Sequence, residues 1–426
     1  MIRFYIKTYG CQMNERESEA LACLLDSLGY TETFREEEAD VIILNTCSVR
    51  EQAERKAIGK AGLLKRLLCD KPNLVIGIIG CMAQNRGQSL FELIPHLSFV
   101  AGTEQLHQVP EMIKKALAGK RRLAELGQGE PVYHECPGHK PGGVCAMTSV
   151  MRGCNQFCTY CIVPYTRGRE RSREIPAIVD EITMLAERGT KEILLLGQNI
   201  TAYGLVEARE NGTYTPEISP FAELLEAVNG IPGIERIRFT SPHVRFMNDR
   251  FIDAICSLPK VCKSFHIPLQ SGSDRMLRLM HRGYTAEAFL KRVDSIKSKL
   301  PEVAFSTDVI VGFSSETQED FEATRALMKA VGFKNGSVIG QHTLRFVVAA
   351  VIAAVLASVI VLPLSKGLLT FIFAQIGSVS STGIAFDAVE IFGVCPAILL
   401  GMTVIGTLLT ALYTKTIKAS DTASIE

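Results

Sequence analysis

The chain has 426 residues, which is too long for one ordinary domain and favours two or three. Its 46 basic and 45 acidic residues give a net charge of +1, so no overall excess of positive charge indicates a nucleic-acid partner. The chain opens without a signal-peptide pattern, so its thirteen cysteines favour metal binding over a disulfide framework.

Three strand-and-turn units lead the sequence, and a cysteine follows each predicted strand. The apolar pattern predicts three strands and two intervening helices, over residues 2–8, 40–45 and 74–79 and over 15–28 and 50–68. Buried strands that alternate with helices are typical of a parallel α/β sheet. We therefore predict an N-terminal parallel α/β domain over residues 1–126.

A second series of strands and helices follows a segment rich in glycine and proline, residues 127–145, which we predict to be a linker. The expected strands of this series lie over residues 146–151, 192–196, 236–239, 264–267 and 304–311. Helices fill the gaps, for example over residues 178–188 and 286–299. Five strand–helix repeats fit a partial or complete (β/α) barrel, which we place at residues 146–338.

The last ninety residues are far more apolar than the rest. Two stretches without a charged residue, 346–362 and 391–413, approach or reach the length that spans a bilayer. Basic residues flank the pair on the outside, and acidic residues lie between them, which favours a hairpin with both ends in the cytoplasm. We predict two transmembrane helices in residues 339–426, with a pair of buried core helices as the alternative.

Three cysteines, Cys154, Cys158 and Cys161, lie within eight residues just after the first barrel strand. A four-iron cluster normally takes four cysteines, so three leave one iron open to bind the amino and carboxylate groups of S-adenosylmethionine (SAM). One-electron reduction of SAM at that iron breaks a carbon–sulfur bond and releases a 5′-deoxyadenosyl radical. The alternative is a zinc site, although this spacing is atypical of structural zinc. Its fourth ligand would be Cys136, His139 or Cys145.

Three further cysteines, Cys11, Cys47 and Cys81, each follow the carboxyl end of a predicted parallel strand. Those ends share one edge of a sheet, so the three thiols can meet there and hold a second three-cysteine cluster. On spacing alone, three unremarkable turn cysteines are an equal alternative.

Longer motifs around both sets of cysteines resemble the methylthiotransferase family of radical SAM enzymes. The amino-terminal matches are residues 9–14 (YGCQMN), 45–47 (NTC) and 80–84 (GCMAQ). The matches in the second half are the cluster loop and two later strands, at residues 152–168, 266–273 and 307–313. The resemblance covers about residues 1–335, and its motifs are specific.

The resemblance implies insertion of sulfur at an unactivated C–H bond and methylation of that sulfur. One SAM molecule would supply the methyl group, and a second the radical. Two [4Fe–4S] clusters are implied, and the auxiliary one on Cys11, Cys47 and Cys81 would hold or supply the sulfur. An external electron donor is implied as well.

Residues 10–14 (GCQMN) resemble the branch that adds a methylthio group to C2 of isopentenyladenosine next to the anticodon of tRNA. The branches that act on threonylcarbamoyladenosine in tRNA, or on an aspartate of a ribosomal protein, usually carry other residues after that cysteine. The implied location is the cytoplasm, where the apolar tail would tether the enzyme to the inner membrane.

Contacts to SAM are expected at the ends of barrel strands, where such folds carry their function. Gly197, Gln198 and Asn199 follow the second barrel strand and resemble a family segment near SAM, although an ordinary turn is the alternative. The other expected contacts are Gln270, Ser271 and Gly312. The last of these opens the family's glycine loop, which here has serines where proline and glycine are usual.

A basic run lies beside the cluster loop, consisting of Arg167, Arg169, Arg171 and Arg173. Phosphate contact is the functional prediction for this run. A solvated face that is paired with the interleaved Glu170 and Glu174 is the alternative.

The family resemblance ends near residue 336. The family would continue through a last barrel strand and a small all-β domain that binds RNA, but residues 339–426 resemble the end of an ABC-transporter permease of the FtsX type. The expectation is an enzyme truncated before its RNA-binding domain and joined to a permease fragment, with an inactive fusion product as the alternative to an active enzyme.

Overall fold

A computed structural model describes residues 2–49, 51–127 and 138–332 of the chain. The chain divides into two compact units, Met1–Ile310 and a second that begins at Val311. Both predicted membrane spans and the whole FtsX-like tail lie outside the described residues. None of the helices within the described ranges is long and apolar enough to cross a lipid bilayer.

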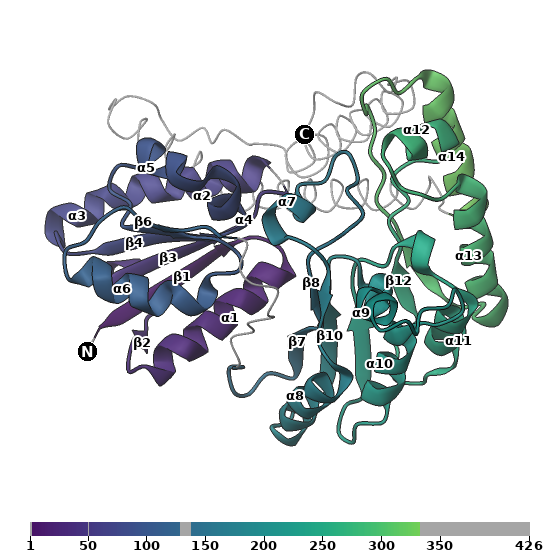
Figure 1. Ribbon diagram of the computed structural model, residues 1–426, viewed down its shortest axis with the longest axis horizontal. Helices are drawn as coiled ribbons and strands as arrows, with labels where there is room; N and C mark the ends of the chain where they lie inside the picture. The colour runs from purple at the N-terminus through teal and green to yellow at the C-terminus, as the bar shows by residue number, and fades with distance from the viewer. Residues whose placement is uncertain (1, 50, 128–137, 333–426) are drawn as a thin grey trace, which may run out of the picture. The chain divides into compact units, whose positions relative to one another are not determined.

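The first part of unit one is a parallel α/β domain, as predicted (Figure 1). Its described strands form one parallel sheet in the order β2-β1-β3-β4-β5-β6. They are β1 (Arg3–Tyr9), β2 (Thr31–Glu32), β3 (Val41–Thr46), β4 (Val75–Gly80), β5 (Phe99–Ala101) and β6 (Leu123–Glu125). The two central strands are buried along their whole length, which is why they are continuous apolar runs. The pattern did not reveal β2, β5 and β6, because two or three residues are too few to show a period.

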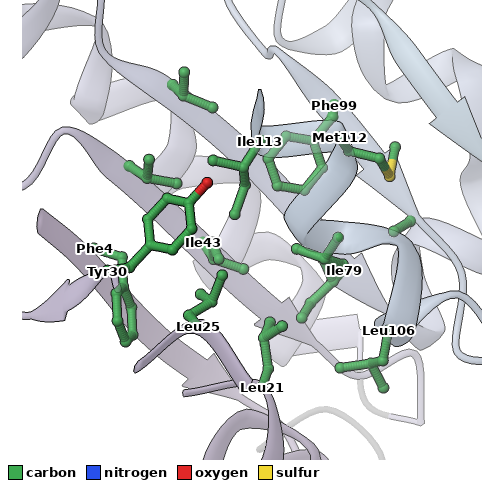
Figure 2. Close-up of a cluster of buried hydrophobic side chains, with 14 of the residues drawn as sticks. Phe4, Leu21, Leu25, Tyr30, Ile43, Ile79, Phe99, Leu106, Met112 and Ile113 are labelled. Carbon is green, nitrogen blue, oxygen red and sulfur yellow. The ribbon is translucent and has the colours of Figure 1, made fainter. Parts of the chain in front are cut away.

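Helices cover both faces of this sheet and bury its apolar side chains. One face packs against α1 (Gln12–Ser27) and α6 (Val109–Leu117), and Figure 2 shows the resulting cluster around Phe4, Leu25 and Ile113. The other face packs against α2 (Glu51–Leu63), α4 (Cys81–Arg86) and α5 (Leu90–Leu93). The short α3 (Leu67–Asp70) follows α2. The core fixes the sheet, and with it the edge at which the strands end.

The second part of unit one is a partial (β/α) barrel. Three parallel strands lie in the order β11-β10-β7, and a second parallel pair joins β12 to β13. Their bounds are β7 (Cys145–Ser149), β10 (Glu192–Leu196), β11 (Arg236–Phe239), β12 (Ser264–His266) and β13 (Ala304–Ser306). Two contacts connect the three-stranded sheet to the β12–β13 pair. One is an isolated parallel bridge between Ile237 and Val261, and the other is the stacking of the Phe239 and Phe265 rings.

Helices follow the barrel strands, as the sequence pattern predicts. They are α8 (Ile175–Glu187), α9 (Leu205–Glu210), α10 (Pro220–Asn229), α11 (Asp249–Ser257), α12 (Asp274–Leu279) and α13 (Ala286–Lys299). The predicted helix over 286–299 matches α13 residue for residue.

Three of the predicted barrel strands are shorter than expected, and one of them, β12, ends a single residue early, at His266. The strand predicted over 146–151 ends at Ser149, and the chain then forms β8 (Met151–Arg152), which pairs antiparallel with β9 (Arg171–Ser172). At the break, the Val150 N–H still donates to the Leu196 carbonyl (3.0 Å) while its own carbonyl accepts from Arg173 (2.9 Å). This two-stranded ribbon closes the base of the cysteine loop. The strand predicted over 304–311 is reduced to the three residues of β13.

The second unit is described from residue 311 to 332 and consists of a loop and α14 (Gln318–Val331). Thr317 and Asp320 cap the helix reciprocally, each side chain accepting from the other's backbone N–H. In the preceding loop, Gly312 has a φ of +74° and Ser315 a φ of +69°. Ser315 therefore holds the left-handed conformation that favours glycine, in the segment where the family usually carries glycine and proline.

Gly77 and Gly59 offer a matched test of this core. A Cβ on Gly77 would lie 2.1 Å from the Phe99 ring, whereas a Cβ on the exposed helical Gly59 would meet nothing within 4 Å. We expect Gly77→Ala to lower the free energy of unfolding by about 1–3 kcal/mol through overpacking. Gly59→Ala should raise it by about 1 kcal/mol because alanine is the better helix former. Urea denaturation of both variants measures this, and equal effects would contradict the packing described for β4 and β5.

Candidate active site

The three amino-terminal cysteines meet at one edge of the first sheet. Cys11 lies between β1 and α1, Cys47 follows β3, and Cys81 opens α4 directly after β4. Cys47 lies close enough to Cys11 and Cys81 to interact with both, and all three cysteines line one cavity. Residues that are 36 and 34 positions apart in the chain are thus neighbours, because adjacent parallel strands end side by side.

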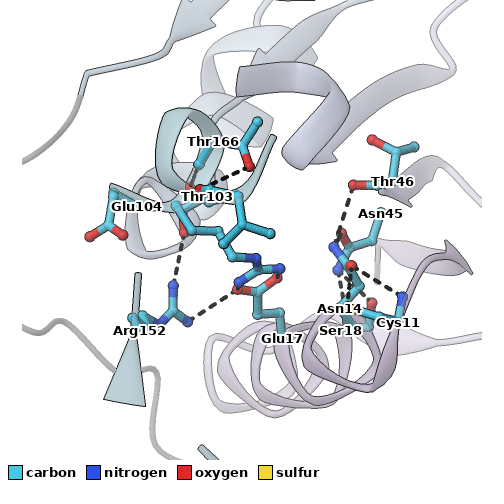
Figure 3. Close-up of polar contacts among 12 residues, drawn as sticks. Cys11, Asn14, Glu17, Ser18, Asn45, Thr46, Thr103, Glu104, Arg152 and Thr166 are labelled. Carbon is cyan, nitrogen blue, oxygen red and sulfur yellow. Dashed lines mark hydrogen bonds and ion pairs between the residues drawn. The ribbon is translucent and has the colours of Figure 1, made fainter. Parts of the chain in front are cut away.

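A buried pair of asparagines ties the first two cysteine segments together (Figure 3). The Asn14 amide group donates to Asn45 Oδ1 (3.0 Å), and the Asn45 amide group donates to the Asn14 carbonyl (2.8 Å). Asn14 Oδ1 also accepts from the backbone N–H (3.3 Å) and the thiol (3.2 Å) of Cys11. Gly80 completes the arrangement, because a Cβ there would lie 2.5 Å from Asn45 Oδ1 and its φ is +92°. The motif residues around the cysteines are therefore the parts that hold the three segments in contact.

The three thiols of this cysteine set differ in pKa. Hydrogen bonding from Cys47 lowers the pKa of Cys11 and of Cys81 to about 6, and the same bonds raise the pKa of Cys47. The positive charge of Arg167 lowers the pKa of both Cys11 and Cys81 further. Since the thiolate is the form that binds metal, two of the three side chains are suited to metal binding near neutral pH.

The second cysteine set lies on the loop that the β8–β9 ribbon closes. Cys154 and Cys158 are buried and Cys161 is half-buried. The Cys154 N–H donates to the Gly168 carbonyl (3.1 Å), and the Cys161 N–H to the Cys158 carbonyl (2.9 Å). Burial raises the pKa of Cys154 to about 12 and also raises that of Cys161, so metal binding here must displace protons.

Arg282 is a buried residue of this site that motif reading did not single out. Its guanidinium donates to Cys158 Sγ (3.4 Å) and to the Tyr160 hydroxyl (3.2 Å), and also to the Pro268 carbonyl (3.4 Å). It thereby joins the cysteine loop to the chain that leaves β12. Arg282 lies 124 residues after Cys158 in the chain, so no local sequence pattern predicts this contact.

One cavity of about 230 Å³ contains residues from both parts of unit one. All three amino-terminal cysteines line it, together with Gly197 and Gln198 from the end of β10. The remaining lining residues are Gln12, Met13, Val49, Val163, Arg167, Leu196, Thr240 and Ser241. The Gln198 side-chain oxygen is buried and accepts no hydrogen bond from the described residues, so it can accept from a ligand there.

The other expected SAM residues lie elsewhere. Asn199 is buried, and its amide group donates to Glu170 Oε1 (3.4 Å), which also accepts from the backbone N–H of Asn155 in the cysteine loop (3.2 Å). Gln270 and Ser271 are buried after β12, and Gln270 exchanges backbone hydrogen bonds with Asp308 and Ile310. The last expected contact, Gly312, belongs to the second unit.

The basic run is built into the protein rather than displayed as a solvated face. Arg167 is buried against Glu17, and Arg171 pairs with Glu104 (2.7 Å), both acids of the N-terminal domain. Arg173 pairs with Glu181 (2.7 Å) on α8. Three of the four arginines thus bind carboxylates from other elements, and Arg169 is the exposed member.

Neither cysteine set is arranged around a single ion. In the part of the chain that the structure describes, no three His, Cys, Asp or Glu side chains are grouped to hold one metal ion. A zinc ion needs its ligands together at about 2.0–2.3 Å from one centre. A four-iron cluster instead takes one cysteine on each of several irons.

Family models match both parts of unit one, and the second match continues into unit two. Residues 3–102 match the model described as "Uncharacterized protein family UPF0004", and residues 148–328 match that of the "Radical SAM superfamily". The chain is also similar to curated bacterial proteins named tRNA-2-methylthio-N(6)-dimethylallyladenosine synthase. The one from Caldicellulosiruptor saccharolyticus is 47% identical over 78% of this chain and 69% of that protein. The one from Opitutus terrae is 44% identical over 78% of this chain and 75% of that protein.

Solved structures share the fold at low sequence identity. The radical SAM methyltransferase TsrM from Kitasatospora setae has a TM-score of 0.56 at 14% identity, covering 78% of this chain and 71% of that chain. The cobalamin-dependent SAM radical enzyme OxsB has a TM-score of 0.54 at 11% identity, over 77% of this chain and 52% of that chain. At these identities the likeness concerns the fold alone.

Alkylation of the metal-free protein tests the electrostatics of the amino-terminal set. Cys11 and Cys145 are both exposed, but the pKa of Cys11 is lowered to about 6 whereas burial and the Glu192 charge raise that of Cys145. Below pH 6 both are thiols, and above it Cys11 is a thiolate. We expect the iodoacetamide rate at Cys11 to level off above about pH 7, while that at Cys145 still rises at pH 9. Peptide mass spectrometry gives both rates, and parallel profiles would contradict the thiol network.

Proposed function

Because this chain belongs to the radical SAM methylthiotransferases of the tRNA-2-methylthio-N(6)-dimethylallyladenosine synthase family, we propose that it modifies tRNA. Its substrate is isopentenyladenosine (dimethylallyladenosine) next to the anticodon, and the product carries a methylthio group at C2. The observation that carries the proposal is the cavity in which Cys11, Cys47 and Cys81 face the carboxyl end of β10.

The cysteine loop supplies the site for radical generation. Cys154, Cys158 and Cys161 would hold a [4Fe–4S] cluster, which together with SAM would supply radical chemistry to the site. Arg282 orients the loop through Cys158, and Glu170 holds the loop to Asn199. Gln198 offers a free acceptor to the polar groups of SAM. Gln270, Ser271 and Gly312 remain proposed SAM contacts.

The auxiliary set is proposed to hold the second [4Fe–4S] cluster and the sulfur. Three converging thiols, two of which ionise near neutral pH, form a donor set that fits such a cluster. The cavity that they line with Gly197 and Gln198 keeps this site next to the end of β10. A cluster held there would supply the sulfur at the cavity that the three cysteines share with Gly197 and Gln198.

The proposed partners are tRNA and an external electron donor. The adenosine must leave the stacked anticodon loop to reach a buried cavity, as enzymes that act on nucleobases require. The other branches of the family are the alternatives: threonylcarbamoyladenosine in tRNA, or a ribosomal-protein aspartate. The similarity to synthases of 2-methylthio-dimethylallyladenosine favours the isopentenyladenosine branch.

The tail stays a prediction. A tether to the inner membrane, a truncation before the RNA-binding domain and the FtsX-type resemblance all concern residues 339–426, which lie outside the described ranges. The described part of the chain carries both cysteine sets.

Nucleoside mass spectrometry of tRNA tests the proposal. The chain is expressed in cells that lack their own methylthiotransferase but make isopentenyladenosine. We expect 2-methylthio-isopentenyladenosine to appear, because both cluster sites are present. Cys158→Ala should abolish it by removing a cluster ligand, whereas Cys69→Ala, an exposed cysteine on α3, should leave it unchanged.

The other outcomes separate the alternatives. Methylthiolated threonylcarbamoyladenosine, or a methylthiolated ribosomal protein, would assign the chain to another branch. Cells that make the protein but contain only unmodified isopentenyladenosine would identify an inactive fusion product. Persistence of the product in Cys158→Ala would refute the ligand assignment.

A further inference from the structure

Arg167 occupies a singular position between the two cysteine sets. It ends α7 (Val163–Arg167), the helix that follows directly on Cys161. Its side chain nevertheless lines the cavity of Cys11, Cys47 and Cys81, where it is the one charged residue among those described. The loop that would hold the SAM cluster thus places a guanidinium at the auxiliary site.

A buried carboxylate fixes this guanidinium. Arg167 donates to Glu17 through both terminal nitrogens, at 2.7 and 3.2 Å, and the second arginine, Arg152, approaches the same carboxylate at 3.3 Å. The side chains of Arg167 and Glu17 are 3% and 2% exposed. Arg152 also donates to the Thr103 carbonyl (3.1 Å). Figure 3 shows the contacts of Arg152 with both Thr103 and Glu17. The Arg167 guanidinium is therefore held at the cavity of the auxiliary cysteines by a buried carboxylate that does not itself line this cavity.

The charge of Arg167, which lines the cavity, acts on the group that the cysteines would bind. A four-iron cluster on three thiolates is negatively charged, and one-electron reduction makes it more negative. Buried charges interact strongly because little water screens them. A fixed positive charge stabilises the reduced form more than the oxidised form.

We infer that Arg167 is a positioning residue that raises the reduction potential of the auxiliary cluster, and that Glu17 opposes it by partly neutralising its charge. This inference rests on the proposed function, since it requires a cluster on Cys11, Cys47 and Cys81. It assigns a redox role to a residue of the SAM-cluster loop. The two cluster sites are then coupled through one side chain.

The test uses the full chain with Cys154, Cys158 and Cys161 all changed to alanine, so that only the auxiliary cluster can form. After anaerobic reconstitution, the cluster is titrated with dithionite and redox mediators, which supply the single electron, and the reduced fraction is followed by EPR. The parent carries Arg167 and Glu17 unchanged. Three variants are compared with it: Arg167→Met, Arg167→Lys and Glu17→Gln.

The charges predict opposite signs for the two partners. Arg167→Met should lower the ratio of reduced to oxidised cluster at a fixed potential by about tenfold, which is 59 mV for one electron. Glu17→Gln should raise that ratio, and Arg167→Lys should stay near the parent because it keeps the charge. A purely structural role would move both neutral variants in the same direction or leave the potential unchanged.

A control variant separates the effect of the Arg167 charge on the potential from the effect of losing an ion pair between the two parts of unit one. Arg171→Met breaks the pair with Glu104, which also joins the two parts of unit one, but Arg171 lines a different cavity, of about 660 Å³. Its potential should equal that of the parent. Unchanged potentials in Arg167→Met and Glu17→Gln would overturn the inference. A parent that binds no cluster would instead overturn the second cluster of the proposed function, which is a distinguishable failure.

Discussion

The buried carboxylate of Glu17 is the interaction on which the site depends. It lies on α1, about one turn after Asn14, and binds arginines from both ends of the cysteine loop, Arg152 and Arg167. Removing one partner of a buried ion pair costs about 3–5 kcal/mol, because the remaining charge stays buried and unpaired. The contact therefore imposes one arrangement of the sheet edge against the barrel, and with it the position of the three amino-terminal thiols.

The motifs around the cysteines have a structural explanation that does not require the metal. Asn14 and Asn45 exchange hydrogen bonds between two strand ends, and Gly80 leaves room for them at a third. The three thiols are thus brought together by contacts between protein groups. Arg282 likewise positions Cys158, because its guanidinium donates a hydrogen bond to the Cys158 sulfur. A site organised in this way loses little conformational entropy when a cluster assembles in it.

The sequence predicts the parts of this site that depend on local pattern. Long apolar strands such as β3 and β10 are evident from composition, and the rule that parallel strands end at one edge predicts that Cys11, Cys47 and Cys81 meet. The pairing of Arg167 with Glu17 joins residues 150 positions apart, which no periodicity reveals. The sequence also does not predict the turn at Val150, because the apolar residues Val150 and Met151 continue the strand pattern. In the structure the chain stops pairing with β10 at this point and pairs with β9 instead. Neighbouring arginines that look like a surface patch are ion-pair partners of distant acids.

The central claim is that one chain holds two separate four-iron sites, each on three cysteines. Iron and sulfide analysis with Mössbauer spectroscopy tests this most directly, on the reconstituted wild type and on two variants. One variant lacks Cys11, Cys47 and Cys81, and the other lacks Cys154, Cys158 and Cys161. The account predicts about eight irons per chain in the wild type and about four in each variant. A wild type with about four irons, all lost from one variant and none from the other, would contradict it.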